Sequence, residues 1–540
     1  MPAAKRRPED VAYSAASWAL GVEYVDDLKR PPVQDELLPA VGLPRPVIDA
    51  CRNLASHLRE HHRDFYQRTA DETEGLLAKE IKEAQASDLG KIDTFRFEED
   101  KVLLAALESL SGTRWDEAAE WAELRVEKRP DQSFWLRDDP ARQSAWRLIL
   151  SVARLGQAMS RAGALASLGT AQEDEGLDGA VRAYVERGAA VDQAHRQMEQ
   201  HRVALLYPQV PGFESLRQRL DEARVLWREW ADGWAREFSA LCRARGFLPS
   251  PSLQQRHLFD EVVRPMCQEP GVTALFVVDA LRYEMAEELY QALSDTPATS
   301  IHLKARLAEL PTLTAVGMNA LAPVTTAKAR LLPVMDRDSG AISGFSSTEL
   351  RVTDPESRRR AMHDRVGGVT CPWHTLEEVT ARDANWLKRS VSQARLVVVH
   401  SLEIDQAGEN GVGPAVFAHI LQKLKAAWRL LRDAGVRRFV ITSDHGFLLL
   451  DGASTAQPHG RRIDPKRRHV YVTVPADHTG EARVSLSELG YEGEGFLCFP
   501  ESTAVFDTGK RPMSFVHGGN SLQERVIPVL TLVHRAAAGG

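Results

Sequence analysis

Hydrophobic residues recur at two different spacings along this chain, and the spacing changes near residue 250. Before that point apolar side chains lie three and four residues apart, which predicts amphipathic helices. These stretches run from Ala50 to Arg68, Asp100 to Leu110, Trp115 to Glu127 and Ala141 to Met159. Beyond Gly271, short apolar runs alternate with helical stretches. The pattern therefore predicts an all-α region followed by an α/β domain.

The short apolar runs of the second half predict β-strands. They are Leu275 to Asp279, Leu396 to His400, Arg438 to Thr442, Val470 to Val474, Gly495 to Phe499 and Ile527 to Val533. Helical stretches lie between them at Arg282 to Leu293 and Ala415 to Asp433. Strands that alternate with helices predict a mostly parallel sheet with helices on both faces. Ligands of such sheets lie at the carboxyl ends of the strands.

A segment rich in proline and serine, Gly246 to Ser252, predicts a linker between the two halves. We therefore expect a helical N-terminal region over residues 1–250. A linker and a short helix, Leu253 to Met266, would occupy residues 251–270, and the α/β domain residues 271–540.

Aromatic residues mark the end of the helical half. Trp227, Trp230 and Trp234 recur at helical spacing, and Phe238 and Leu241 continue the stripe. Such a stripe indicates a buried helix face rather than a surface for a partner.

Composition narrows the class of protein only mildly. Hydrophobic residues make up 43% of the 540 residues, enough for globular cores, and the net charge of −7 is small for this length. Five widely separated cysteines indicate a reducing cytoplasm rather than a disulfide framework. The chain has no apolar run of about 20 residues, the length that a membrane span requires. Its first residues carry basic charge but no apolar core, so we expect no signal peptide.

Side chains that can hold metal ions follow three of the predicted strands and recur late in the chain. Carboxylates beside neutral imidazoles suit zinc or manganese. Several carboxylates in one pocket repel one another unless cations neutralise them. Two divalent ions about 3.5–4 Å apart form a clamp for phosphoryl or sulfuryl transfer. The candidate ligands are Asp279, Asp405, Glu409, Asp444, His445 and, before two glycines, His517.

Thr314 is a candidate nucleophile. It stands directly before a helix-like run that ends at Leu321. A hydroxyl there would lie near backbone N–H groups and, once ionised by a metal, could attack phosphorus. Threonine is also a common N-cap residue, and the local sequence leaves both readings open.

Taken together, five ordered motifs resemble the PglZ domain, a branch of the alkaline phosphatase superfamily. They run from Val278 to Glu284, Pro311 to Leu321, Ile404 to Glu409, Thr442 to Phe447 and His517 to Glu524. The resemblance covers roughly residues 271 to 533. The helical half is similar to the region that precedes this domain in PglZ proteins of BREX phage-defence systems. Such proteins are often longer than this chain.

The resemblance implies an alkaline-phosphatase-like fold and a role for each candidate residue. One metal ion would be held by Asp279, Asp444 and His445, with Thr314 as bridging ligand and nucleophile; the other ion would be held by Asp405, Glu409 and His517. Two zinc ions are the expected cofactors. Glu409 stands where many superfamily members have histidine, so the second site is richer in oxygen and leaves manganese or magnesium open there. The implied reaction is attack by Thr314 on a phosphodiester, followed by hydrolysis of a phosphothreonine intermediate.

Three functions remain open at this point. The first is a cytoplasmic metal-dependent phosphodiesterase or nuclease of bacterial phage defence. The second is a scaffold subunit that binds other BREX proteins, such as a PglX-type methyltransferase, with a silent or residual metal site. The third is a phosphatase or sulfatase for a small molecule. We expect no membrane partner.

Several basic residues bear on the substrate. A run before the strand at Val470 either follows a nucleic-acid backbone or is a solvated surface. It comprises Arg461, Arg462, Lys466, Arg467 and Arg468. We expect Arg282 to pair with a neighbouring carboxylate, and the cluster Arg358 to Arg360 to form a charged turn or helix face. His400 is a candidate support for a metal ligand.

Overall fold

The chain folds into two compact units. The first comprises Met1–Gln157 with His201–Ala223, and the second Ala158–Gln200 with Arg224–Gly540. Parts of the helical half therefore belong to the same unit as the sheet. The computed structural model describes residues 8–128, 133–165, 176–203, 209–297, 299–324, 330–336, 341–368, 370–451, 455–459, 468–474, 477–509 and 513–534.

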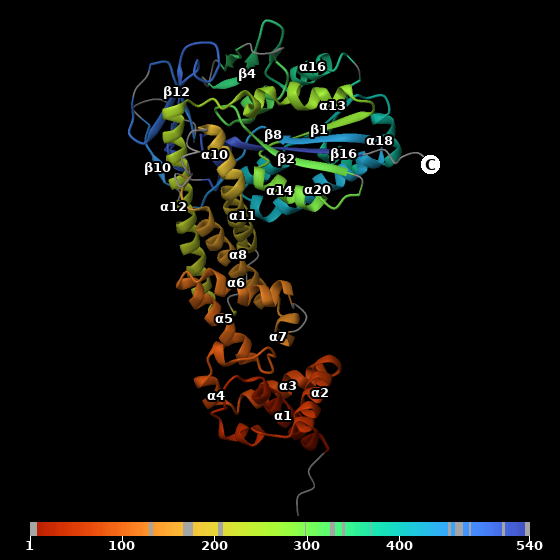
Figure 1. Cartoon of the computed structure of the whole chain (residues 1–540), viewed down its shortest axis with the longest axis vertical. Coiled ribbons are helices and arrows are strands. Elements are labelled where there is room, and N and C mark those ends of the chain that lie inside the picture. The colour runs from red at the N-terminus through yellow and green to blue at the C-terminus, as the bar shows by residue number, and fades with distance from the viewer. Residues whose placement is uncertain are drawn as a thin grey trace, which may run out of the picture. The chain divides into compact units, whose positions relative to one another are not determined.

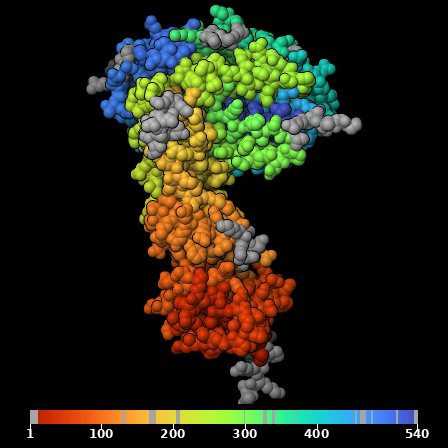
Figure 2. Space-filling view, viewed as in Figure 1, coloured from red at the N-terminus to blue at the C-terminus, as the bar shows by residue number. Residues whose placement is uncertain are grey.

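Helices build the first unit, as the hydrophobic spacing predicts, and their side chains pack closely in the red and orange part of Figure 2. The stretch from Ala50 to Arg68 forms two helices rather than one, because the backbone angles of His62 are not helical (φ −133°, ψ 53°). A π-helical turn, Leu124–Lys128, continues α6. The helices are α1 (Pro8–Asp27), α2 (Arg45–His61), α3 (Arg63–Glu74), α4 (Ala78–Glu83), α5 (Arg96–Ser111), α6 (Trp115–Glu123), α7 (Phe134–Arg137) and α8 (Pro140–Ala162).

The described residues between α8 and Gly246 contain α10 (Leu177–Ala183), α11 (Ala189–Val203) and α12 (Phe213–Arg245). The aromatic stripe lies on α12. Trp227, Trp234 and Phe238 are almost fully buried, which confirms the predicted core face there, whereas Trp230 and Leu241 are half-buried. The short helix predicted over Leu253 to Met266 is confirmed in its second half. Two 3₁₀ turns, Pro251–Leu253 and Gln255–His257, come first, and a π-helical turn, Phe259–Val263, then continues into α13 (Arg264–Gln268).

A six-stranded mixed sheet forms the centre of the second unit, and the predicted mostly parallel sheet is confirmed. Its order is β2 (Thr299–Leu307), β16 (Val526–His534), β8 (Val436–Ser443), β1 (Val272–Val278), β7 (Leu396–Ser401) and β6 (Trp373–Thr375). β1 runs parallel to β7 and β8, and β7 parallel to β6. Only β16 runs antiparallel to its neighbours β8 and β2.

Helices cover both faces of this sheet. α14 (Tyr283–Leu293) and α20 (Gly413–Asp433) lie on one face and α13 on the other (Figure 1). Between the sheet and the first pair, Phe276, Ile441, Leu289 and Leu424 are at most 2% exposed. Each such side chain contributes about 1.5–3 kcal/mol when buried. This core fixes β1, β7 and β8 and therefore the positions of the residues that follow them.

Two of the predicted strands do not join the central sheet. β11 (Val470–Val472) and β13 (Phe496–Pro500) form a separate antiparallel sheet with β12 (Glu481–Ser485). The remaining elements are β3 (Leu332–Met335), β4 (Ile342–Ser346), β5 (Arg351–Val352), β9 (Leu448–Leu449), β10 (Ala456–Gln457), β14 (Val505–Phe506), β15 (Phe515–Val516), α15 (Thr314–Ala320), α16 (Pro355–Arg365), α17 (Leu376–Ala381), α18 (Ala384–Val391), α19 (Glu403–Glu409) and α21 (Leu522–Arg525). Among the helices of the described segments, none is both long and apolar enough to cross a membrane.

Candidate metal centre

The ends of β1 and β8 bring three candidate ligands together. The two strands are parallel neighbours, so Asp279 and Asp444 each follow a strand end at the same edge of the sheet. One ligand atom each from Asp279, Asp444 and His445 lies within 4.8 Å of the others. His445 Nε2 is 3.6 Å from Asp279 Oδ1 and 3.4 Å from Asp444 Oδ2. These three residues are buried and form the first ligand group.

Thr314 faces this first ligand group. It is the first residue of α15, and the N-cap position belongs to Leu313, without a side-chain capping bond. The Thr314 Oγ lies 3.4 Å from Asp279 Oδ1 and 3.3 Å from His445 Nε2. The N-cap reading of Thr314 is therefore wrong, and its hydroxyl is directed at the candidate metal ligands.

Backbone contacts hold the first ligand group in place. Ala280 has a left-handed backbone (φ 59°), and its N–H donates to Asp444 Oδ1 at 3.1 Å. The Ser443 hydroxyl accepts from Leu281 N at 2.9 Å and donates to the His445 carbonyl at 2.7 Å. These bonds tie the two strand ends to each other, so Asp279 and Asp444 cannot move apart independently.

A second ligand group lies beside the first. Asp405, Glu409 and His517 also bring ligand atoms within 4.8 Å of one another, and Glu409 is exposed. Asp405 and Glu409 are four residues apart on α19, a spacing that places both on one helix face. The rings of His445 and His517 stack with centroids 4.2 Å apart and an interplanar angle of 10°. The two groups are thus adjacent parts of one centre.

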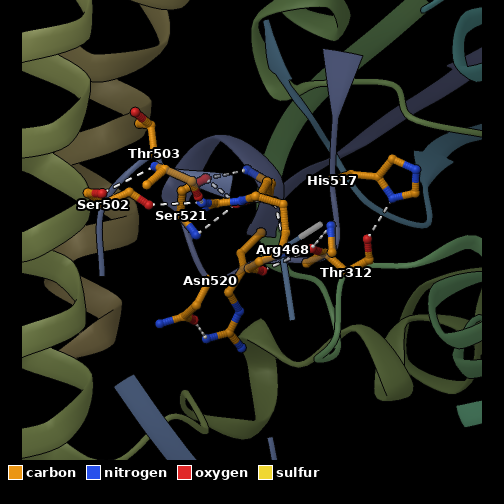
Figure 3. A network of polar contacts seen from close by, with 12 residues as sticks. Thr312, Arg468, Ser502, Thr503, His517, Asn520 and Ser521 are labelled. Atoms are coloured by element: carbon orange, nitrogen blue, oxygen red, sulfur yellow. Dashed lines mark hydrogen bonds and ion pairs between the residues drawn. The ribbon is translucent and has the colours of Figure 1, made fainter. Parts of the chain in front are cut away.

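A buried polar network fixes His517 (Figure 3). The Thr312 carbonyl accepts from His517 Nδ1 at 3.0 Å, and the Thr312 hydroxyl donates to the Gly519 carbonyl at 2.9 Å. The Gly519 N–H donates to the Glu524 carboxylate at 2.8 Å, and Arg468 Nη2 donates to the same carboxylate at 2.7 Å. Thr312 therefore holds the ring of a candidate ligand through backbone and side chain.

Arg468 corrects one expectation about the basic run. Its side chain is fully buried against Glu524, and its guanidinium also donates to the carbonyls of Ser502 and Ala504. It supports the His517 loop and is not a surface contact for nucleic acid. Arg461, Arg462, Lys466 and Arg467 lie outside the described residues.

The hydrogen bonds of both imidazoles fit a metal-ligand role. Each Nδ1 contacts a carbonyl oxygen, that of Gly446 at 2.9 Å for His445 and that of Thr312 for His517, so each Nδ1 carries the proton. The neutral His445 ring then presents the lone pair of its Nε2 to carboxylate oxygens. Asp444 Oδ2 and Asp405 Oδ1 are buried and have no hydrogen-bond partner in the described segments. Acceptors that face one another without a shared proton are satisfied by a cation.

The pKa directions agree with this arrangement. Burial lowers the pKa of His445 to about 3, which keeps its ring neutral. Burial, followed by repulsion from Asp444, raises the pKa of Asp279 well above its usual range. Burial also raises the pKa of Asp444 and of Asp405. The carboxyls would take up protons by themselves, whereas divalent cations would favour their charged forms.

Other residues predicted near the site take different roles. Arg282 pairs with Glu284 through Nε at 2.9 Å, as expected, and its guanidinium lies 4.5 Å from the centroid of the Phe447 ring. His400 is half-buried beside Trp373, with ring centroids 6.2 Å apart. No hydrogen bond joins His400 to a candidate ligand within the described segments.

The arginine cluster is only partly a charged helix face. Arg359 and Arg360 are exposed on α16, as predicted, but Arg358 is buried and donates to Asn319 Oδ1 at 3.1 Å. Three consecutive arginines predict exposed side chains throughout, so the sequence did not indicate that Arg358 is buried. Residues 355–365 show no apolar stripe that would mark the buried face of the helix, so the sequence carried no signal for it.

Comparison with known sequences identifies relatives for this architecture. Residues 258–532 match the family described as the BREX system PglZ alkaline phosphatase-like domain. The chain is 25% identical over 373 residues to the alkaline phosphatase-like protein BrxZ of Escherichia coli, which covers 65% of this chain and 41% of that protein. It is 23% identical over 333 residues to the alkaline phosphatase-like protein PglZ of Bacillus cereus, covering 59% and 37%. The matched part thus spans about two fifths of each relative.

Solved structures with a related arrangement are more distant. Murine ectonucleotide pyrophosphatase/phosphodiesterase 5, in its inactive form with AMP, is 12% identical with a TM-score of 0.33 and covers 49% of this chain and 88% of its own. Phosphonoacetate hydrolase from Sinorhizobium meliloti, with phosphonoacetate, is 11% identical with a TM-score of 0.30 and covers 48% and 89%.

Proposed function

The chain belongs to the BREX system PglZ family through its alkaline phosphatase-like domain, and from this premise we propose that it is a metal-dependent phosphodiesterase with Thr314 as nucleophile. One observation supports the proposal most strongly. The Thr314 hydroxyl lies 3.4 Å from an Asp279 oxygen and 3.3 Å from the neutral His445 Nε2, within the first ligand group.

Two divalent metal ions complete the proposed site. The first would be held by Asp279, Asp444, His445 and the Thr314 oxygen, and the second by Asp405, Glu409 and His517. When bound, such ions supply Lewis-acid stabilisation of the negative charge that develops on oxygen. Two carboxylates and an imidazole suit zinc at the first group. Glu409 makes the second group richer in oxygen and also suited to manganese or magnesium.

The proposed reaction proceeds by two displacements at phosphorus. The Thr314 Oγ gives up its proton to solvent and attacks phosphorus, so the Oγ–P bond forms while the bond to the leaving oxygen breaks. The leaving oxygen takes a proton from water. A water molecule then attacks the phosphothreonine, the Oγ–P bond breaks, and Thr314 regains a proton. Asp279 and Asp444 hold their positions throughout because strand-end hydrogen bonds tie them together.

We further propose that the physiological substrate is nucleic acid and that the protein acts with other BREX proteins, such as a PglX-type methyltransferase. Family membership supports the setting in phage defence. The basic run from Arg461 to Arg467 supports the choice of substrate, because clustered cations follow a phosphate backbone.

Metal reconstitution tests the proposed function. Protein stripped by a chelator should neither cleave bis(p-nitrophenyl) phosphate nor nick plasmid DNA, and zinc, manganese or magnesium should restore both activities. Cleavage of p-nitrophenyl phosphate in place of the diester would indicate a phosphomonoesterase rather than a phosphodiesterase. Asp444→Asn serves as the matched control, because it keeps the size of the side chain but removes the charge of a ligand. A protein that binds two ions and turns over none of the three substrates would be a scaffold, and the hydrolase proposal would fail.

A further inference from the structure

Gln255 connects the strand end that carries Asp444 to the loop that leads to Thr314. It lies in the segment that the sequence predicts to be a linker, and its side chain is fully buried. Its Nε2 donates to the Asp444 carbonyl at 2.7 Å and to the Ser443 carbonyl at 3.2 Å. Its Oε1 accepts from the Glu309 N–H at 2.9 Å. One side chain therefore binds two backbone segments of the candidate metal centre at once.

Glutamine is the residue type that this set of contacts requires. Its amide supplies two N–H donors for the two carbonyls and one oxygen for the backbone N–H. Glutamate would turn an acceptor toward two carbonyl oxygens, and asparagine is shorter by one methylene group. An apolar side chain of equal length would leave three buried backbone groups without partners, which is unfavourable in a protein interior.

The Glu309 end of this connection is held from both its backbone and its side chain. Arg256, the residue after Gln255, donates from Nε to the Glu309 carboxylate at 2.7 Å. The Tyr491 hydroxyl donates to the same carboxylate at 2.9 Å. Two consecutive residues of the linker segment thus bind Glu309, and the loop that runs from Glu309 to Thr314 begins at a fixed point.

The Asp444 end is the place where α15 meets the strand. The helix packs so closely against the Asp444 carbonyl that Gly317 has no room for a Cβ. Thr314 is the first residue of this helix, and its hydroxyl lies 3.4 Å from Asp279 Oδ1. A shift of the Asp444 backbone or of the preceding loop would therefore change the distance from the Thr314 oxygen to the first ligand group.

We propose that Gln255 is a positioning residue, which holds Asp444 in place as a metal ligand and Thr314 in place as the nucleophile. The part that concerns Thr314 rests on the proposed function, whereas the part that concerns Asp444 requires only a bound metal ion. Reactive groups must be held within about 0.5 Å of their productive geometry, and buried hydrogen bonds supply this precision. Gln255 precedes residues 258–532, which match the family, so the family resemblance assigns it no role.

Zinc titration of the metal-free protein against a chromophoric chelator tests the inference without requiring turnover. Gln255→Met keeps the length of the side chain but removes all three hydrogen bonds. One of the two zinc ions should bind about 10- to 100-fold more weakly, the usual loss when a group that supports a ligand is removed. The other ion should bind as in wild type. Asp444→Asn identifies the affected ion, because it should weaken the same one.

The matched control is Gln254→Met, one residue earlier in the same segment. The Gln254 side chain is also buried, and its Nε2 donates to the Pro249 carbonyl at 2.9 Å rather than to a ligand segment. This variant also loses a buried hydrogen bond, so it should be less stable than wild type. It should nevertheless bind both zinc ions with wild-type affinity.

Turnover gives a second measurement if the wild type hydrolyses bis(p-nitrophenyl) phosphate. At saturating zinc, Gln255→Met should lower kcat by about 10-fold or more and leave KM nearly unchanged, because the displaced oxygen reacts with the substrate rather than binding it. Gln254→Met should change neither constant. An unchanged kcat in zinc-saturated Gln255→Met would show that Gln255 does not position Thr314.

Two results of the zinc titration would overturn the inference. Wild-type affinity for both ions in folded Gln255→Met would show that Gln255 does not position Asp444. Equal weakening of both ions would show a general loss of structure. Should Gln255→Met not fold, Gln255→Glu keeps the size of the side chain and should show the same selective loss of one ion. If the wild type hydrolyses no ester but Gln255→Met selectively loses one ion, the hydrolase proposal fails and the positioning of Asp444 stands.

Discussion

The neutral His445 ring distinguishes this centre from an ordinary buried ion-pair network. The Gly446 carbonyl lies 2.9 Å from its Nδ1, and burial lowers its pKa to about 3. The single proton of the neutral ring therefore lies on Nδ1, and the Nε2 lone pair faces Asp279 and Asp444. A cation between this lone pair and the carboxylates satisfies the arrangement.

Thr312→Val should weaken the second metal site while leaving the first intact. Valine keeps the shape of the side chain but removes the hydroxyl that binds Gly518 N at 3.0 Å and the Gly519 carbonyl at 2.9 Å. Loss of such support typically costs about 10- to 100-fold in metal affinity. Metal content after gel filtration should fall toward one ion per chain. Two tightly held ions in the variant would show that Thr312 does not position His517.

At the residue scale, the burial of charged side chains is the property that could not be predicted from the sequence. Every candidate ligand could be read from strand ends and spaced motifs, since the order of polar residues after apolar runs is a local pattern. Arg358 and Arg468 stand in basic runs whose local pattern indicates solvent. Their burial depends on Asn319 and Glu524, which are 39 and 56 residues distant in sequence. No local pattern reports such a contact.

Among the elements, the strands that were predicted well are those with continuous apolar runs. β1, β7 and β8 are buried on both faces and so have this composition. β2 was missed because it is half-exposed and alternates apolar and polar residues, as in Ile301, His302, Leu303 and Lys304. The antiparallel direction of β16 depends on its pairing with β2 and β8, which the sequence of β16 does not specify.

Gly317→Ala should damage the metal centre through the packing of α15. A Cβ at this position would meet the Asp444 carbonyl oxygen at 2.3 Å, and neither backbone can yield without moving a ligand. We expect the free energy of unfolding to fall by about 1–3 kcal/mol and zinc binding to weaken. The matched control is Gly233→Ala in α12, where a Cβ meets nothing within 4 Å. Denaturant unfolding and zinc titration of both variants would measure the difference, and equal effects would contradict this account.

At the scale of the whole molecule, the basic run separates a nuclease from a small-molecule hydrolase. Neutralising Arg461, Arg462, Lys466 and Arg467 should weaken DNA binding. Each lost phosphate contact should reduce the slope of log K against log salt by about 0.7–0.9. Cleavage of bis(p-nitrophenyl) phosphate should hardly change, because that substrate does not reach the run. Unchanged DNA affinity would make the run a solvated surface and favour a small-molecule substrate.

Arg468 must be left out of that variant, since it is buried against Glu524. Arg468→Gln should act through the fold instead. Removing one partner of a buried pair costs about 3–5 kcal/mol, so the variant should unfold at lower temperature with an unchanged salt slope for any binding that remains. A normal melting temperature combined with a shallower slope of log K against log salt would show that Arg468 contacts nucleic acid.

Hydrolysis of bis(p-nitrophenyl) phosphate by zinc-saturated Thr314 variants tests the central claim most directly. Thr314→Ser keeps a hydroxyl near Asp279 and His445 and should retain measurable turnover. Thr314→Ala removes the attacking oxygen and should lower kcat by about 1,000-fold or more, with the fold intact by circular dichroism. Wild-type turnover by folded, zinc-saturated Thr314→Ala would show that the nucleophile lies elsewhere and would contradict the proposed mechanism.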